Sequence, residues 1–360
     1  MSLGTRSGES EYISFAALNN KNSFIIKRSV NLGNFLTGET VYNAWKRLEP
    51  FVHRTPLLTS STTNQMVGKN VYFKMENQQK TGAFKFRGAT FKLMQLPKEQ
   101  LQNGVVTASA GNHAQGVAYA GAKLGVDTTI FMAEGTPLAK INATKAYGAE
   151  VVLVGESFQE AFEASLERKA ETGAAYIHPF DDYDVMAGQG TIAMEMLRQE
   201  DRIDTILVPI GGGGLISGIA TAAKHINRNI KVIGVQASGA AAMHKSFYRN
   251  VTEKLTSVQT IAEGIAVKQP GTQTLPVIRK YVDDIVTVCD EEIASAIVYM
   301  LERNKTLMEG AGAASLAALF KYHDKIRSRN LGVVVSGGNL DIGMLPMIQK
   351  LAGEQRIFAS

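Results

Sequence analysis

The sequence has very little cysteine, a single tryptophan and no long apolar run. Cys289 is the one cysteine among 360 residues, which excludes an internal disulfide framework and favours a reducing, cytoplasmic location. No stretch approaches the roughly 18 consecutive apolar residues of a membrane helix. Basic residues are dispersed and the net charge is only +5. We therefore expect neither a membrane nor a nucleic-acid partner.

What the sequence does contain, from residue 39 onward, is an alternation of short apolar runs with segments of helical periodicity. Strands are predicted over 71–77, 104–109, 128–133, 150–155, 205–210, 231–237 and 331–336. Helices are predicted over 112–125, 137–148, 157–171, 188–200, 214–226, 291–304 and 312–323. The apolar runs are continuous, as in strands covered by helices on both faces. The alternation therefore indicates an open α/β architecture.

Lys85 stands in an unusually apolar and tightly spaced setting. The stretch KTGAFKFRGA places it between Phe84 and Phe86, with glycine or alanine close on both sides, near a predicted helix start. A charged lysine is rarely tolerated unpaired in such surroundings. Burial lowers the pKa of a lysine toward neutrality and frees its amine for covalent chemistry. We interpret Lys85 as a reactive residue.

Three further loops follow predicted strands, where open α/β sheets bind their ligands. The first, SAGNH (Ser109–His113), has small residues that allow close backbone approach, and the next helix start favours an anion. The second is the run Gly211–Gly214, whose conformational cost would be offset by a phosphate on bare N–H groups. The third is Ser336–Asn339. Each loop alone is compatible with an ordinary turn.

Considered together, the lysine and the three loops indicate one ligand. Pyridoxal 5′-phosphate carries an aldehyde for the lysine, a phosphate for the glycines, and a phenolic oxygen and a pyridine nitrogen for the polar loops. The glycine run matches neither the dinucleotide fingerprint nor a Walker loop. We therefore predict pyridoxal 5′-phosphate as the cofactor.

The motifs KTGAFKFRGA, SAGNH, GGGGL and SGGN, in this order and spacing, resemble the fold type II pyridoxal-phosphate enzymes. Within them, the sequence is most similar to the threonine dehydratase and serine racemase branch, over about residues 39 to 350. The resemblance implies two open, mainly parallel twisted sheets flanked by helices, as in the tryptophan synthase β-chain. It also implies a large domain over 39–99 and 186–360, a small domain over 100–185, and a homodimer or homotetramer. Residues 1–38 are expected to form an N-terminal arm.

The resemblance also implies roles for individual residues. Lys85 forms the covalent imine with the cofactor and, once displaced by the substrate amine, removes the Cα proton. Phe84 flanks the cofactor ring, Asn112 binds its phenolic oxygen, and Ser336 meets the pyridine nitrogen. The phosphate is held by Gly211, Gly212, Gly213, Gly214 and Leu215, and the substrate carboxylate by the backbone of Ser109, Ala110, Gly111, Asn112 and His113. The implied reaction deaminates the small hydroxy amino acids L-threonine, to 2-oxobutanoate and ammonia, and L-serine, to pyruvate.

Two departures from the racemases of this branch affect the expected chemistry. Ala110 stands where those enzymes have a second serine, so elimination is favoured over racemisation. Gln236, followed by Ala240, Ala241 and Ala242, stands where they have acidic metal ligands, so no divalent-metal site is predicted.

Regulation is expected to differ from that of the biosynthetic threonine dehydratases. Those enzymes continue into an isoleucine-sensing domain, for which this sequence leaves no room. Short catabolic members bind AMP, and the matching positions here are Lys80, Thr81, Gln115, Tyr147 and Asn339, with Ala146 replacing an expected polar neighbour. A role in isoleucine biosynthesis and one in threonine catabolism both stay open.

Other functions also stay open on the sequence alone. Serine racemase and 3-hydroxyaspartate dehydratase use the same scaffold, and an enzyme for a second carboxylate should carry an added Arg or Lys in its pocket. A non-catalytic cofactor-binding or nucleotide-binding regulator is disfavoured by the intact Lys85. The acidic pair Asp181–Asp182 is predicted to form a turn and a helix cap.

Overall fold

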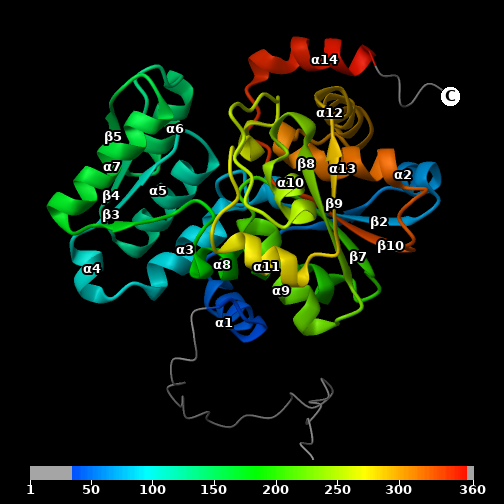
Figure 1. The fold of residues 1–360 in the computed structure, drawn as a ribbon, viewed down its shortest axis with the longest axis horizontal. Helices are drawn as coiled ribbons and strands as arrows, with labels where there is room; N and C mark the ends of the chain where they lie inside the picture. Colours follow the sequence, from blue (N-terminus) through cyan, green and yellow to red (C-terminus); the bar gives the residue numbers. More distant parts are fainter. Residues whose placement is uncertain (1–34, 355–360) are drawn as a thin grey trace, which may run out of the picture. The chain divides into compact units, whose positions relative to one another are not determined.

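The computed structural model describes residues 35–354, and its strands form two separate sheets (Figure 1). The first sheet contains, in spatial order, β1 (Leu57–Thr59), β2 (Asn70–Met75), β10 (Asn330–Val335), β7 (Thr205–Pro209), β8 (Lys231–Ala237) and β9 (Asp284–Val288). Only β1 pairs antiparallel with its neighbour, and the other pairings are parallel. The second contains β5 (Glu150–Leu153), β4 (Thr128–Met132), β3 (Val105–Ala108) and β6 (Ala175–Tyr176), all parallel. The predicted pair of mainly parallel sheets is confirmed.

Helices cover both faces of each sheet, so each sheet has a hydrophobic cluster on either side. One face of the first sheet packs against α1 (Gly38–Leu48), α8 (Tyr183–Gln199), α9 (Gly214–Ile226) and α11 (Thr274–Tyr281), and the other against α12 (Asp290–Asn304) and α13 (Gly310–Tyr322). The second sheet packs against α3 (Lys85–Gln95) and α5 (Asn112–Leu124) on one face and α7 (Phe158–Thr172) on the other. The remaining helices are α2 (Ser61–Val67), α4 (Lys98–Gln102), α6 (Leu138–Ala146), α10 (Ala242–Arg249) and α14 (Leu345–Glu354). This two-sided cover explains the continuous apolar strands.

The predicted and observed bounds agree best for one strand and the helix before it. β8 and α9 have the predicted bounds of 231–237 and 214–226. The helix predicted to start at 188 starts at Tyr183 instead, because the Asp182 carboxylate accepts the N–H groups of Asp184 and Val185 and caps the helix there. Several short elements were not predicted: β1, β9, α2, α4, α10, α11 and α14.

Helix α8 is buried from Val185 to Leu197 and packs closely on two neighbours through glycines. A Cβ atom on Gly188 would lie 2.6 Å from the Cα of Gly88 in α3, and one on Gly190 would lie 2.6 Å from the carbonyl oxygen of Gly218 in α9. Only glycine permits backbones to approach this closely. α8 therefore sets the positions of α3 and α9, whose first residues belong to the predicted site.

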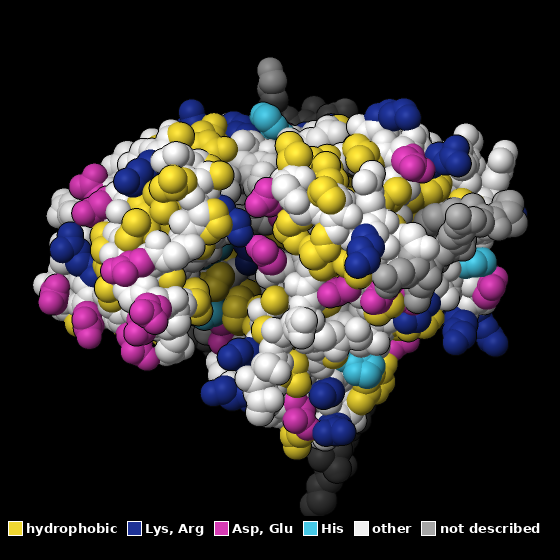
Figure 2. Space-filling view, turned by 90° about the horizontal axis from the view of Figure 1, so that it is seen from above, with side chains coloured by type: hydrophobic (Ala, Val, Ile, Leu, Met, Phe, Trp, Pro, Cys, Tyr) yellow, Lys and Arg dark blue, Asp and Glu magenta, His cyan; other side chains and the backbone are white. Residues whose placement is uncertain are grey.

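Within residues 35–354, no helix is long and apolar enough to cross a membrane. Lys, Arg, Asp and Glu side chains are scattered over the face shown in Figure 2 without a continuous basic patch. Residues 1–34 of the predicted N-terminal arm lie outside the described residues, and Gly38 already begins α1.

Candidate active site

Lys85 is the first residue of α3, and its side chain is held by a hydrogen bond and an aromatic contact. Its Nζ donates to the carbonyl oxygen of Pro179 at 2.8 Å and lies 5.3 Å from the ring centroid of Phe84. Burial lowers the pKa of Lys85 to about 8, and the Glu309 carboxylate partly opposes this. The amine is therefore far more easily deprotonated than that of an exposed lysine.

The Ser336 loop pairs directly with the segment that precedes Lys85. Phe84 N–H donates to the Ser336 carbonyl at 3.1 Å, and Gly338 N–H donates to the Gly82 carbonyl at 2.9 Å. Ser336 follows the buried strand β10 and is itself only 2% exposed. The structure thus brings the Ser336 loop next to the lysine segment, which lies about 250 residues earlier in the sequence.

The SAGNH loop joins the same cluster at the start of α5. Asn112 Nδ2 donates to Glu309 Oε1 at 2.7 Å, and Asn112 Oδ1 accepts from Asn339 Nδ2 at 2.8 Å. α5 packs tightly on α3, because a Cβ atom on Gly116 would lie 3.0 Å from the backbone carbon of Lys85. Asn112 is therefore positioned by its helix and by two amide hydrogen bonds.

The glycine run lies between β7 and α9 and offers unpaired N–H groups. Gly213 has φ +103°, a left-handed conformation that favours glycine. Among the described residues no acceptor is found for the N–H groups of Gly211, Gly212 and Gly213, and the first turn of α9 cannot supply one. Such a cradle of N–H groups at a helix start suits a phosphate.

Phe180 connects the glycine run to the lysine. A Cβ atom on Gly212 would collide with the Phe180 ring, and one on Gly214 would lie 2.8 Å from the Phe180 carbonyl oxygen. The preceding residue, Pro179, accepts the hydrogen bond of Lys85. One short segment after β6 therefore contacts both the amine and the glycine run.

Comparison with known proteins agrees with this geometry. Residues 48–337 match the family model described as pyridoxal-phosphate dependent enzyme. The chain belongs to this family. It is 46% identical over 313 residues to an L-threonine ammonia-lyase of Thermotoga maritima, covering 87% of this chain and 78% of that protein. It is 47% identical over 299 residues to the catabolic L-threonine dehydratase TdcB of Staphylococcus aureus, covering 82% of this chain and 86% of that protein.

Solved structures of the same fold are also similar. The processed form of threonine deaminase isoform 2 from Solanum lycopersicum superposes with a TM-score of 0.85 at 36% identity, covering 93% of this chain and 94% of that one. Maize serine racemase superposes with a TM-score of 0.84 at 38% identity, covering 89% of this chain and 99% of that one. The residues present fit the family's cofactor, since an amine of lowered pKa, unpaired N–H groups and a fixed amide lie on the loops that the motifs occupy.

Glu309, which immediately precedes α13, was not predicted as a site residue. Its N–H donates to the Gly337 carbonyl at 3.2 Å, and its carboxylate accepts from Asn112. Burial raises the pKa of Glu309 to about 7; the nearby Glu263 carboxylate adds to the rise, and the Asn112 hydrogen bond, Lys140 and Lys85 oppose it. The following GAGAA stretch, which signals a close backbone approach like that of the other loops, was the one available sequence clue.

His113 was predicted to contribute its backbone, and its side chain is structural. The imidazole is buried, with Nε2 2.9 Å from the Ile177 carbonyl oxygen. Burial lowers the pKa of His113 to about 3, with further lowering from Lys85 and His178. The ring is therefore neutral and donates to Ile177, which tethers α5 to the segment after β6.

Both members of the acidic pair cap helices; the cap at Asp182 was predicted and the one at Asp181 was not. Asp182 caps α8. The Asp181 carboxylate accepts the N–H groups of Thr272, Gln273 and Thr274, at the start of α11.

Among the positions matched to an AMP site, a hydrogen bond joins Asn339 to Thr81. Asn339 Nδ2 donates to the carbonyl oxygen of Thr81 at 2.8 Å. Thr81 directly follows Lys80 in the chain. Gln115 lies in the first turn of α5, and the Tyr147 ring packs edge-on against Tyr119 at 5.3 Å. An AMP site at these positions stays a prediction.

In the described part of the chain, no group of three or more His, Cys, Asp or Glu residues could hold a metal ion. Gln236, at the position compared with the racemases' metal ligands, accepts from His244 N–H at 2.7 Å through Oε1.

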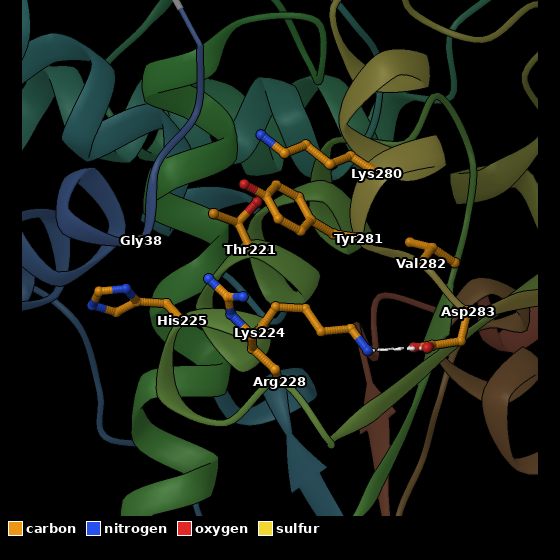
Figure 3. A pocket seen from close by; sticks show the side chains of 9 residues that line it. All are labelled: Gly38, Thr221, Lys224, His225, Arg228, Lys280, Tyr281, Val282 and Asp283. Carbon is orange, nitrogen blue, oxygen red and sulfur yellow. Dashed lines mark hydrogen bonds and ion pairs between the residues drawn. The ribbon is translucent and has the colours of Figure 1, made fainter. Parts of the chain in front are cut away.

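A cavity of about 570 Å³ lies elsewhere, and none of the predicted site residues lines it (Figure 3). Its lining includes Lys224, His225 and Lys280. These three lie in the last turns of α9 and α11, where cations stabilise the helix dipole. Lys224 also forms an ion pair with Asp283 at 2.8 Å. The helix ends and this ion pair therefore account for much of the basic lining.

Proposed function

We propose that this protein is an ammonia-lyase that converts L-threonine to 2-oxobutanoate and ammonia, and L-serine to pyruvate and ammonia. The observation that carries the proposal is the Lys85 amine of lowered pKa on α3, which packs against the helix that begins at Asn112 and is linked through Pro179 and Phe180 to the glycine run. The names of relatives at 46% and 47% identity support the same reaction.

Pyridoxal 5′-phosphate, when bound, supplies the electron-withdrawing group that stabilises negative charge at the substrate Cα. Gly211–Leu215 would hold its phosphate, Asn112 its phenolic oxygen, and Ser336 its pyridine nitrogen, with Phe84 flanking the ring. Lys85 Nζ would carry the cofactor at rest and, as a free amine, take the proton from the substrate Cα. The backbone of Ser109–His113 would orient the substrate carboxylate.

Ala110 supports elimination rather than racemisation. A racemase needs a proton donor on each side of the Cα atom, and a methyl group cannot serve as one. With Lys85 as the single base, loss of the β-hydroxyl is the favoured outcome.

Several finer features belong to the same proposal. The large domain comprises 39–99 and 186–360, and the small domain comprises 100–185. This division is supported by the sheets: the strands within 57–75 and 205–335 form one sheet, and the strands within 105–176 form the other. We also propose a cytoplasmic homodimer or homotetramer. The word catabolic in the Staphylococcus aureus name favours threonine catabolism.

The test combines product analysis with chemical trapping. Cofactor-saturated protein is incubated with L-threonine, L-serine and D-serine, and 2-oxo acids and serine enantiomers are measured. Borohydride reduction should fix the cofactor on Lys85 in a peptide identified by mass spectrometry, and Lys85→Ala should lose both the label and the activity. Formation of D-serine faster than pyruvate would instead favour the serine racemase reaction.

A further inference from the structure

A small cavity of about 40 Å³ lies beside the Asn112 cluster. Glu309 and Asn339, which both hydrogen-bond Asn112, line this cavity together with Lys140, Glu263 and Asp341. It is therefore the space that adjoins the loop proposed to hold the substrate.

Glu263 begins a short 3-10 helix, η3 (Glu263–Ile265), between the glycine run and Glu309. A Cβ atom on Gly211 would lie 3.1 Å from the Cα of Ile265, and one on Gly264 would lie 3.7 Å from Glu309 Oε1. The segment is thus in contact with both the proposed phosphate cradle and the Asn112 cluster.

The charged groups of this cavity are mostly acidic. Glu263, Glu309 and Asp341 contribute carboxyl groups, and Lys140 contributes the one ammonium group among the lining residues. Lys140 Nζ lies 2.9 Å from Glu263 Oε2, so this cation already has a partner. The side chains of Lys140 and Glu263 are 35% and 63% exposed. Each can therefore rearrange when the other is substituted.

We propose that the Lys140–Glu263 pair determines the substrate class, admitting hydroxy amino acids with an uncharged side chain and disfavouring those with a second carboxylate. The inference rests on the proposed function and deepens it. A side-chain carboxylate at this cavity would meet three carboxyl groups and a cation bound to one of them. Neutralising Glu263 removes one negative charge and releases the Lys140 ammonium for such a substrate.

The experiment compares L-aspartate with L-asparagine, which have nearly the same shape and differ in one charge. Neither carries a β-hydroxyl group, so calorimetric affinities for the cofactor-loaded protein do not depend on elimination. Glu263→Gln should raise the ratio of aspartate to asparagine affinity at least fivefold over the wild type. The double variant Lys140→Met/Glu263→Gln should lose that gain, because the released cation is gone. Turnover of 3-hydroxyaspartate relative to threonine should rise in parallel in the single variant.

Glu253→Gln is the matched control, because Glu253 pairs with Arg249 at 3.1 Å and does not line the cavity. It makes the same change in net charge and should leave the affinity ratio unchanged. A ratio in Glu263→Gln within twofold of the wild type overturns the inference, as does a gain that persists in the double variant. If both amino acids bind without a change in ratio, the proposed function stands and only the inference fails. If neither amino acid binds Glu263→Gln while threonine is still deaminated, the inference also fails and the proposed function stands. Absence of threonine deamination by the cofactor-loaded wild type contradicts the proposed function itself.

Discussion

At the scale of single residues, the burial that lowers the pKa of Lys85 also affects the stability of the protein. Its amine is held in a setting that disfavours the charged form, and the pKa of about 8 in the folded state is below the usual 10.5. Between these two values the unfolded chain binds more protons than the folded one. The stability of the wild type without cofactor should therefore rise with pH across this window, and below it the buried lysine is destabilising.

Lys85→Met should accordingly stabilise the cofactor-free protein at pH 7. Each pKa unit corresponds to about 1.4 kcal/mol, so we expect a gain of about 1–3 kcal/mol at pH 7 that shrinks as the pH rises from 8 to 10.5. Urea unfolding at several pH values measures the difference. Lys98→Met, at an exposed position of α4, is the control and should change stability little. A Lys85→Met gain that is constant over this range would contradict the assignment.

At the scale of elements, the glycine contacts of α8 explain how two distant motifs meet. α3 begins with Lys85 and α9 begins with the glycine run, and both cross α8 at positions where neither helix has a side chain. A larger residue at such a crossing must push backbone away from backbone, because no flexible side chain can yield. The starts of α3 and α9 would then separate.

Gly188→Ala should therefore destabilise the protein and weaken cofactor binding together. Its Cβ would lie 2.6 Å from the Gly88 Cα, and overpacking of this kind typically costs about 1–3 kcal/mol. Urea unfolding and a fluorescence titration with pyridoxal 5′-phosphate measure the two effects. Gly135→Ala, where nothing lies within 4 Å of the added atom, should change stability by less than about 0.5 kcal/mol. Equal behaviour of the two variants would rule out a tight crossing.

At the scale of the whole molecule, a buried group of four charges joins elements from distant parts of the chain. Arg87 is bound by Glu76 at 2.7 Å and by Glu195 at 2.7 Å, and Glu195 also binds Lys74 at 2.8 Å. These residues belong to β2, α3, α8 and the turn after β2, and the two positive charges balance the two negative ones. Every N–H-bearing nitrogen of Arg87 donates at least one hydrogen bond.

Removing Arg87 should be far more damaging than removing an exposed arginine. Arg87→Met leaves two carboxylates without their shared partner in the interior and should cost about 3–5 kcal/mol. Arg202, whose side chain is 65% exposed in its pair with Glu200, provides the comparison, and Arg202→Met should shift the denaturant midpoint far less than Arg87→Met does. Denaturant midpoints of both variants measure the difference. Losses of similar size would show that the buried group contributes no more than a surface pair.

Features that depend on neighbours in the chain were predictable from the amino-acid order. The α9 and β8 bounds follow from local pattern, as do the apolar setting of Lys85 between two phenylalanines and the glycine run after an apolar strand. So does the helix cap at Asp182, whereas Asp181 caps α11 some 91 residues away. Glycine and continuous apolar runs carry strong local preferences, and these survive in almost any tertiary context.

The remaining features arose only when the chain folded. Glu309 meets Asn112 across 197 residues, Pro179 meets Lys85 across 94, and Lys140 meets Glu263 across 123. The local sequence does not indicate such pairs, because the secondary-structure propensity of a residue does not depend on whether a distant residue will bind it. Their chemistry comes from burial and proximity, which shift the pKa of Lys85 and of Glu309 in opposite directions. Burial and proximity exist only once the sheets and helices have packed.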